Sequence, residues 1–337
     1  MGSRPVASPL VCMYLFLEDG GTTVPPHPSP RTRSAVRYLE CALVQAASLR
    51  LGDAACDLAI VVNEPALDIP VRAARAIWAR LDEFGVRRIE SDLRVGSGGA
   101  AASRFPREAI RAMAAAETAE RTAWVPNLDC VWVDPARVLG SLPSPGAVGC
   151  LPIGYPSDWS VGGSALAGRS RIELGRTAAR LGAAAASEAP PWIGADLLAG
   201  EVGALQAMME SCDRLEARLP QDGEPAGNEQ LLTLAGALGE MHVADLSAVA
   251  ARIQTGARHG AGTPAGVESL GLWHLPAEKG LSIRRVARAI LGGREAALRA
   301  DLAEPRRAMR RFNVGTPSRA HQLRDDAWVL AQRPRGR

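Results

Sequence analysis

The chain contains a single lysine, Lys279, and every other member of its 39 Lys and Arg residues is arginine. A bias toward arginine codons explains the missing lysines, but it does not explain the one that remains. An ammonium group is a compact point charge that suits phosphate, so Lys279 is a candidate for a binding role. The simpler interpretation is that Lys279 is a solvated surface charge.

Long apolar runs and aromatic side chains are also scarce. No stretch approaches the roughly 20 apolar residues that a membrane-spanning helix needs, and the apolar run at residues 11–17 lacks the flanks of a signal peptide. Aromatic residues make up 4% of the chain, beside 34 glycines and 24 prolines, which predicts a core of small side chains. The sequence therefore predicts a soluble, cytoplasmic protein with no transmembrane segment.

The cysteines and the charge exclude further classes. The six cysteines form no C-x-x-C pair, so they provide neither a zinc spacing nor a disulfide framework, and we expect them reduced and buried. The formal net charge is only +3, with arginine mixed among Asp and Glu along the chain. We therefore expect no nucleic-acid partner.

Strand-like and helix-like segments alternate along the chain, which predicts an α/β fold with a mostly parallel central sheet flanked by helices. We expect one domain over residues 11–302, between an N-terminal tail at 1–10 and an Arg-rich, partly disordered tail at 303–337. Strands are expected at residues 11–17, 57–63, 86–90, 122–133 and 241–246. Helices are expected at residues 34–51, 69–84, 106–117, 172–186, 200–219 and 228–238, and residues 281–302 form an amphipathic, Arg-rich segment. Loops are expected at 19–33 and 259–266, and a long loop or an irregular sheet region at 143–168.

Ligands of open α/β sheets bind beyond the carboxyl ends of the strands, where polar residues are therefore candidates. Asn127 and Asp129 interrupt the otherwise apolar segment T-A-W-V-P-N-L-D-C-V-W-V-D-P at residues 122–135. Positions two apart on an extended chain point to one side, and an amide with a carboxylate can hold Mg²⁺ or Mn²⁺ there. The alternative is that Asn127 only turns the chain after Pro126 and Asp129 caps the turn.

The same segment resembles the apolar strand and Asp-x-Asp signature of GT-A-type glycosyltransferases, with Asn127 in the first Asp position. It is most similar to the family-eight type, which includes the glycogenin-like enzymes. Four further segments follow in that family's order: residues 38–50 with 56–63, residues 81–89, S-R-F-P-R-E-A-I at 103–110, and L-W-H-L-P-A-E-K-G at 272–280. The resemblance implies a GT-A-like nucleotide-diphospho-sugar transferase fold.

The resemblance also implies roles for individual residues. Asp129, Asn127 and His274 would hold a divalent cation, Mn²⁺ or Mg²⁺, although an amide in the first position weakens the affinity for metal. His274 beside Trp273 could equally be a packed residue. The residues expected to contact the donor are Arg104, Lys279, Asn127, Asn228 and Trp192. Glu229 and Asp196 are the carboxylates expected to act in catalysis.

The predicted function is transfer of a sugar from a nucleoside-diphosphate-sugar donor to an unknown acceptor. Asp129, His274 and Lys279 should then share one cleft. One alternative is a sugar-phosphate nucleotidyltransferase, which would place its basic phosphate ligands at residues 19–37. Another is a non-catalytic GT-A-like protein that binds a nucleotide or a partner, which the amide of Asn127 favours.

Overall fold

The computed structural model describes residues 8–17, 30–95, 104–153, 170–183, 187–219, 227–253, 255, 264–315 and 323. Most of the expected loops at 19–33 and 259–266 lies outside these residues, as does most of the chain beyond residue 315. Of the segment 143–168, expected to be a loop or an irregular sheet region, residues 154–168 lie outside and Ala147–Ile153 form a strand.

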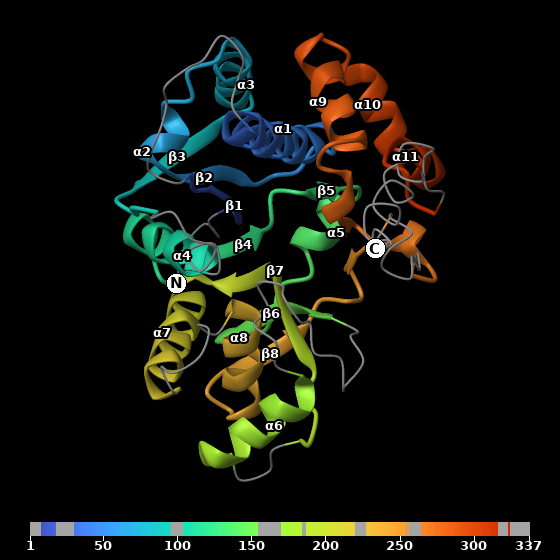
Figure 1. Ribbon diagram of the computed structural model, residues 1–337. Coiled ribbons are helices and arrows are strands. Elements are labelled where there is room, and N and C mark those ends of the chain that lie inside the picture. The colour runs from blue at the N-terminus through green and yellow to red at the C-terminus, as the bar shows by residue number, and fades with distance from the viewer. Residues whose placement is uncertain are drawn as a thin grey trace, which may run out of the picture.

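A seven-stranded sheet forms the centre of the molecule, in the order β3-β2-β1-β4-β7-β6-β8 (Figure 1). Four of its six strand pairings are parallel, and β7 runs antiparallel to both β4 and β6. The expected α/β fold with a mostly parallel sheet is therefore confirmed. The strands are β1 (Leu10–Leu15), β2 (Asp57–Asn63), β3 (Val86–Ser91), β4 (Thr122–Pro126), β6 (Ala147–Ile153), β7 (Trp192–Glu201) and β8 (His242–Asp245).

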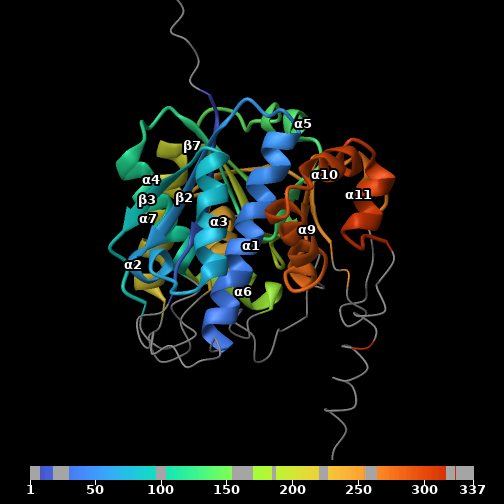
Figure 2. The same cartoon turned by 90° about the horizontal axis from the view of Figure 1, so that it is seen from above.

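Helices cover both faces of this sheet because its central strands are apolar on both sides. In β1, Val11 and Met13 belong to one buried core, whereas Leu10 and Cys12 belong to the other, as the period of two along a strand requires. Helices α1, α3 and α9 pack together over the first face, and α4, α7 and α8 contribute to the second (Figures 1 and 2).

The helices occupy most of the predicted segments. They are α1 (Pro30–Leu51), α2 (Glu64–Leu67), α3 (Arg72–Glu83), α4 (Phe105–Ala116), α5 (Pro135–Leu139), α6 (Arg171–Arg180), α7 (Val202–Arg218), α8 (Asn228–Ala237), α9 (Ser282–Leu291), α10 (Glu295–Leu302) and α11 (Pro305–Arg311), with short 3-10 turns η3 (Val267–Ser269) and η4 (Pro276–Glu278).

A second, three-stranded sheet was not expected from the sequence. It has the order β5-β10-β9, with β5 at Cys130–Trp132, β9 at Ala250–Arg252 and β10 at Leu272–His274. The strand expected within residues 122–133 is found as β4, but the chain then turns between β4 and β5 and enters the other sheet. Cys130 N donates to Asn127 O at 3.2 Å across this turn. Asn127 and Asp129 consequently do not lie on one extended strand.

Two further differences lie in the second half of the chain. Strand β7 was not expected from the sequence, because most of its apolar residues are buried and show no strict alternation. The amphipathic segment at 281–302 forms two helices, α9 and α10, which are separated at Gly292 and Gly293, the latter with φ of 72°. Residues 303–315 were expected in a tail but form α11 and its end, where Phe312 and Val314 are buried in the core.

All six cysteines are free and buried, which confirms the expectation from their spacing. No helix among the described residues has the length and apolar character that crossing a membrane would require.

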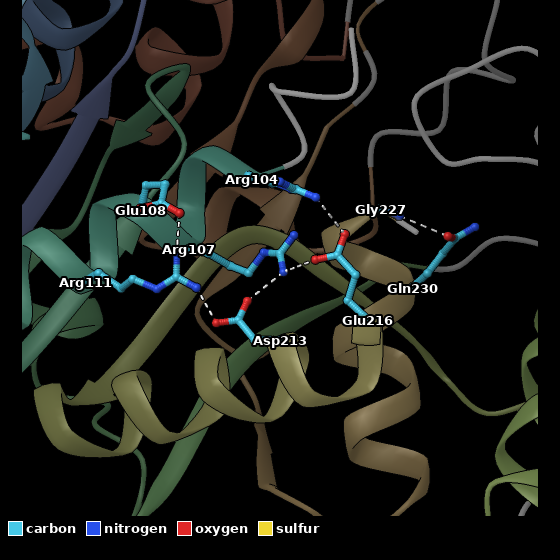
Figure 3. A network of polar contacts seen from close by, with 8 residues as sticks. All are labelled: Arg104, Arg107, Glu108, Arg111, Asp213, Glu216, Gly227 and Gln230. Atoms are coloured by element: carbon cyan, nitrogen blue, oxygen red, sulfur yellow. Dashed lines mark hydrogen bonds and ion pairs between the residues drawn. The ribbon is translucent and has the colours of Figure 1, made fainter. Parts of the chain in front are cut away.

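An arginine-centred network joins α4 to α7 beneath the sheet (Figure 3). The side chain of Arg107 is 2% exposed, and its Nη1 lies 2.8 Å from Asp213 Oδ1 and 2.7 Å from Glu216 Oε2. Arg111 adds ion pairs to Glu108 and Asp213. A buried guanidinium needs such partners, because an unpaired buried charge is strongly unfavourable.

We expect Arg107→Ala to lower the free energy of unfolding by about 1–3 kcal/mol, since it removes a buried stem and two ion pairs. The matched control is Arg104→Ala. The side chain of Arg104 is 57% exposed, and its Nη2 lies 3.4 Å from Glu216 Oε1. Surface pairs of that kind contribute less than about 1 kcal/mol. Urea denaturation of both variants measures the difference, and equal losses would contradict the assignment of Arg107 as the centre of the network.

Candidate functional site

A cavity of about 500 Å³ opens beyond the carboxyl ends of β1 and β4. The strand order reverses at this place, because β2 and β3 extend the sheet on one side of β1 and β4 lies on the other. Crevices at such reversals are where open α/β sheets bind ligands. The polar residues of the wall are Tyr14, Tyr38, Asn127, Asp129, Asp196, Asn228, Glu229, Arg252 and Lys279.

Five charged side chains form a row of alternating sign at the wall of this cavity, with His274 behind the four that line it. His274 lies in the middle, with Nε2 3.2 Å from Asp129 Oδ1 and Nδ1 3.2 Å from Asp196 Oδ2. Each carboxylate meets a second cation: Lys279 Nζ is 3.1 Å from the other oxygen of Asp129, Oδ2, and Arg252 Nη1 is 3.2 Å from the same Oδ2 of Asp196. We call this set the charge row.

The two ends of the charge row are its accessible parts. The side chains of Asp129 and His274 are 2% and 3% exposed, whereas Lys279 is 30% and Arg252 is 24% exposed. An anion that enters the cavity therefore meets an ammonium and a guanidinium backed by buried carboxylates.

The small sheet brings the charge row together. In its register His274 stands opposite both Cys130 of β5 and Arg252 of β9. Leu275 N donates to Asp129 O at 2.9 Å, which holds the turn before β5 against the end of β10. Asp196 comes from the large sheet, so the charge row lies where the two sheets meet.

Lys279 is held by the turn that precedes it. Glu278 is completely buried and accepts hydrogen bonds from Thr255 Oγ1 at 2.6 Å, from Asn313 Nδ2 at 2.9 Å and from Ser282 N at 3.2 Å. Three separate segments thus fix the backbone beside Lys279.

Asn127 is hydrogen-bonded at every polar atom. Its Oδ1 accepts from the hydroxyl of Tyr14, and its Nδ2 donates to Asp196 Oδ1 at 3.0 Å. Its backbone N donates to Asp196 O at 2.8 Å, and its backbone O accepts from Gln45 Nε2 at 3.0 Å. Asn127 therefore both turns the chain and connects the phenol of Tyr14 to the charge row.

The ionisation of the charge row follows from its geometry. Burial by itself would lower the pKa of His274, but the charges of Asp196 and Asp129 outweigh it and raise the pKa to about 9. Burial opposes ionisation of both carboxylates too, yet His274 beside each of them lowers the pKa of Asp129 and of Asp196. His274 is thus an imidazolium at neutral pH.

Glu229 has a different environment from the other two carboxylates. Burial, together with the negative charge of Asp196, raises the pKa of Glu229 to about 7. Its Oε1 lies 3.8 Å from Arg252 Nη1, and its Oε2 accepts from Trp192 Nε1 at 3.3 Å. A carboxylate with that pKa can exchange a proton at neutral pH.

Aromatic side chains line part of the cavity, although the chain contains few. Phe16 follows β1 and packs against Phe105 at the start of α4, with ring centroids 5.3 Å apart. Lys279 Nζ lies 5.3 Å from the ring centroid of Tyr38 on α1. The wall therefore offers an aromatic ring beside Lys279.

The structure brings together most of the residues singled out in the sequence. Asp129, His274 and Lys279 meet in one cleft, as expected from the order of the motifs. Arg104 does not join them, because it precedes α4 with its guanidinium directed to Glu216 (Figure 3). The remaining expected residues, Asn127, Trp192, Asp196, Asn228 and Glu229, line the cavity or contact its wall.

Sequence reasoning missed Tyr14, Gln45 and Arg252. Tyr14 lies in an apolar strand and Gln45 in an apolar stretch of α1. Because buried polar groups are almost always hydrogen-bonded, their presence in these segments indicated partners in the interior. Arg252 carried no such signal, because it is one of many arginines and only the small sheet places it opposite His274.

The expected divalent cation does not fit this arrangement. Among the described residues, no three His, Cys, Asp or Glu side chains are grouped so that they could hold a metal ion. Both nitrogens of His274 face carboxylates, and Oδ1 of Asn127 is taken by Tyr14.

Comparison with known proteins gives likeness in structure only. No protein-family model matches the chain, and no curated protein matches it. Mouse xyloside xylosyltransferase 1 is similar at 14% identity over 82% of this chain and all of that one, with a TM-score of 0.47. The galactosyltransferase LgtC is similar at 9% identity over 84% of this chain and 95% of that one, with a TM-score of 0.46. The bifunctional glycosyltransferase WbbM is similar at 9% identity over 81% of this chain and 46% of that one, with a TM-score of 0.47.

The raised pKa of His274 makes the stability of the protein depend on pH. A group whose pKa is higher when folded contributes stability below its unfolded pKa of about 6.5 and loses it as the pH rises through about 9. We expect the free energy of unfolding to fall by about 1–2 kcal/mol between pH 6.5 and pH 8, below the range in which the six buried thiols, whose pKa burial raises, add to the dependence on pH. Urea denaturation in EDTA at several pH values measures this change.

Two variants isolate the contribution of His274. His274→Gln should be less stable at pH 6.5 and should lose most of the dependence on pH between pH 6.5 and pH 8. The exposed His242 of β8 is the matched control, and His242→Gln should behave as the wild type does. A wild-type stability that stays constant from pH 6.5 to pH 8 would contradict a protonated His274.

Proposed function

We propose that the protein transfers a sugar from a nucleoside-diphosphate-sugar donor to an acceptor in this cavity. The observation that carries the proposal is the charge row, which ends in Lys279 and Arg252 at the place where the strand order reverses. That place suits a nucleotide, and the two accessible cations suit a diphosphate.

In this proposal the charge row stabilises the departing diphosphate. Negative charge develops on the leaving phosphate as the bond to the sugar breaks, and fixed cations in a partly dry site lower the energy of that state. Lys279 and Arg252 would contact the phosphates, while His274 holds Asp129 and Asp196 in place between them. The carboxylates offset the mutual repulsion of the cations and so hold them close to one another before the ligand enters.

Glu229 is the group that we propose for proton transfer. Asp129 and Asp196 stay ionised within their ion pairs, whereas Glu229 has a pKa of about 7 and lines the same cavity. An acceptor hydroxyl loses its proton during transfer, so a carboxylate near its own pKa can take it. Trp192 would orient Glu229 through its indole N–H.

A ligand screen tests the proposed class of substrate. A panel of UDP-, GDP- and ADP-sugars should include at least one that raises the melting temperature, because a ligand that binds only the folded state stabilises it. Sugar phosphates without the nucleotide serve as the comparison. A panel in which no nucleoside-diphosphate sugar shifts the melting temperature would overturn the proposal.

Lys279→Ala should weaken binding of the nucleoside diphosphate about ten- to a hundredfold, the usual cost of losing a hydrogen bond to a charged partner. Lys279→Arg should not restore it fully, because the planar guanidinium approaches phosphate differently. Isothermal titration measures both, with Arg72→Ala on the exposed side of α3 as the control. Wild-type affinity in Lys279→Ala would remove its role in binding phosphate.

Glu229→Gln should lower turnover at least about a hundredfold, as expected for losing a general base, and leave affinity for the nucleoside diphosphate nearly unchanged. In the wild type the rate should rise with pH through about 7, where Glu229 loses its proton, and this inflection should be absent from the variant. Rates of sugar transfer, or of donor hydrolysis if no acceptor is known, measure the effect across pH. A variant that loses affinity and keeps its turnover would contradict the assignment.

A further inference from the structure

We infer that this site binds the diphosphate of its donor without a divalent cation, because the protein supplies the positive charge through Lys279 and Arg252. The inference rests on the proposed function and concerns how the same site holds its ligand. It follows from three features of the described residues.

The first feature is the identity of residue 127. Nδ2 of Asn127 donates to Asp196 Oδ1 at 3.0 Å while its Oδ1 accepts from the hydroxyl of Tyr14. Only an amide can donate and accept in this way, since a carboxylate has no N–H to offer. Aspartate here would place a third carboxylate 3.0 Å from Asp196, so the amide is the group that this network requires.

The second feature is the occupation of Asp129, the carboxylate that a metal would need most. Its Oδ1 faces His274 Nε2 at 3.2 Å, and its Oδ2 faces Lys279 Nζ at 3.1 Å. A cation entering beside Asp129 would have to displace both positive groups or lie against them. Because the side chain of Asn127 already makes its hydrogen bonds, only Asp129 and His274 remain of the three residues that were expected to bind a metal ion.

The third feature is the charge that the protein already provides. The charge row has a cation at each end, Lys279 and Arg252, and each of them is paired with a buried carboxylate. Both terminal cations line the cavity. Cationic groups are what a diphosphate needs nearby, and ion pairs hold these two at fixed positions before any ligand arrives.

The test measures binding of UDP, GDP and ADP by isothermal titration, once in buffer with EDTA and once with about 1 mM Mn²⁺. The wild type should bind its preferred diphosphate with affinities that differ by less than about threefold between the two buffers. Binding that occurs only with Mn²⁺ would overturn the inference and leave the proposed function standing. Absence of binding in both buffers would instead overturn the proposed function itself.

Asn127→Asp supplies the converse experiment. Its third carboxylate should weaken binding about tenfold or more in EDTA, and Mn²⁺ should restore much of the loss, so the variant becomes metal-dependent. Ser144→Asp adds the same charge on an exposed turn and should behave as the wild type does. An Asn127→Asp protein that binds equally well in both buffers would contradict the role given to Asn127. If this variant fails to fold, the comparison of the wild type in the two buffers decides the inference alone.

Discussion

Two buried carboxylates held apart by one imidazolium are the constraint on which the functional end of this molecule depends. Asp129 and Asp196 are almost completely enclosed, and a buried charge is costly unless an opposite charge accompanies it. His274 contacts both carboxylates, and each has a second cation beside it, Lys279 at Asp129 and Arg252 at Asp196. Each group in the charge row is balanced by the opposite charges beside it. Removal of one of the inner three groups therefore leaves a buried charge next to it without its partner.

The architecture of two sheets serves this arrangement. The large sheet alone would provide Asp196 and the ends of β1 and β4, which is enough for a crevice but not for a charged wall. The small sheet places the end of β10 between β5 and β9, so His274 lies behind the wall of the cavity with Arg252 beside it. The break after β4 carries Asp129 from one sheet toward the other. The unexpected second sheet is therefore the element that assembles the site.

The environment also divides the acidic residues into two kinds. Asp129 and Asp196 face cations and stay ionised, so they position the charges that an anionic ligand meets. Glu229 lies nearby but is governed by burial and by the charge of Asp196, which keep its pKa close to neutral. Carboxylates that differ in this way can combine fixed electrostatics with proton exchange inside one cavity.

Local patterns in the sequence were sufficient to predict many of the helices and strands and part of the site. The run D-L-A-I-V-V-N predicted β2 at its observed bounds, Asp57–Asn63, because β-branched residues favour strands, and the order of motifs predicted that Asp129, His274 and Lys279 would meet. Tertiary structure decided the rest. The apolar run of β7 shows no alternation when neighbouring elements bury both of its faces, and nothing near Arg252 in sequence indicates its partner. The role proposed for Arg252 depends on the register between β9 and β10. Pairings between such distant segments are determined by the whole fold rather than by the neighbouring residues in the sequence.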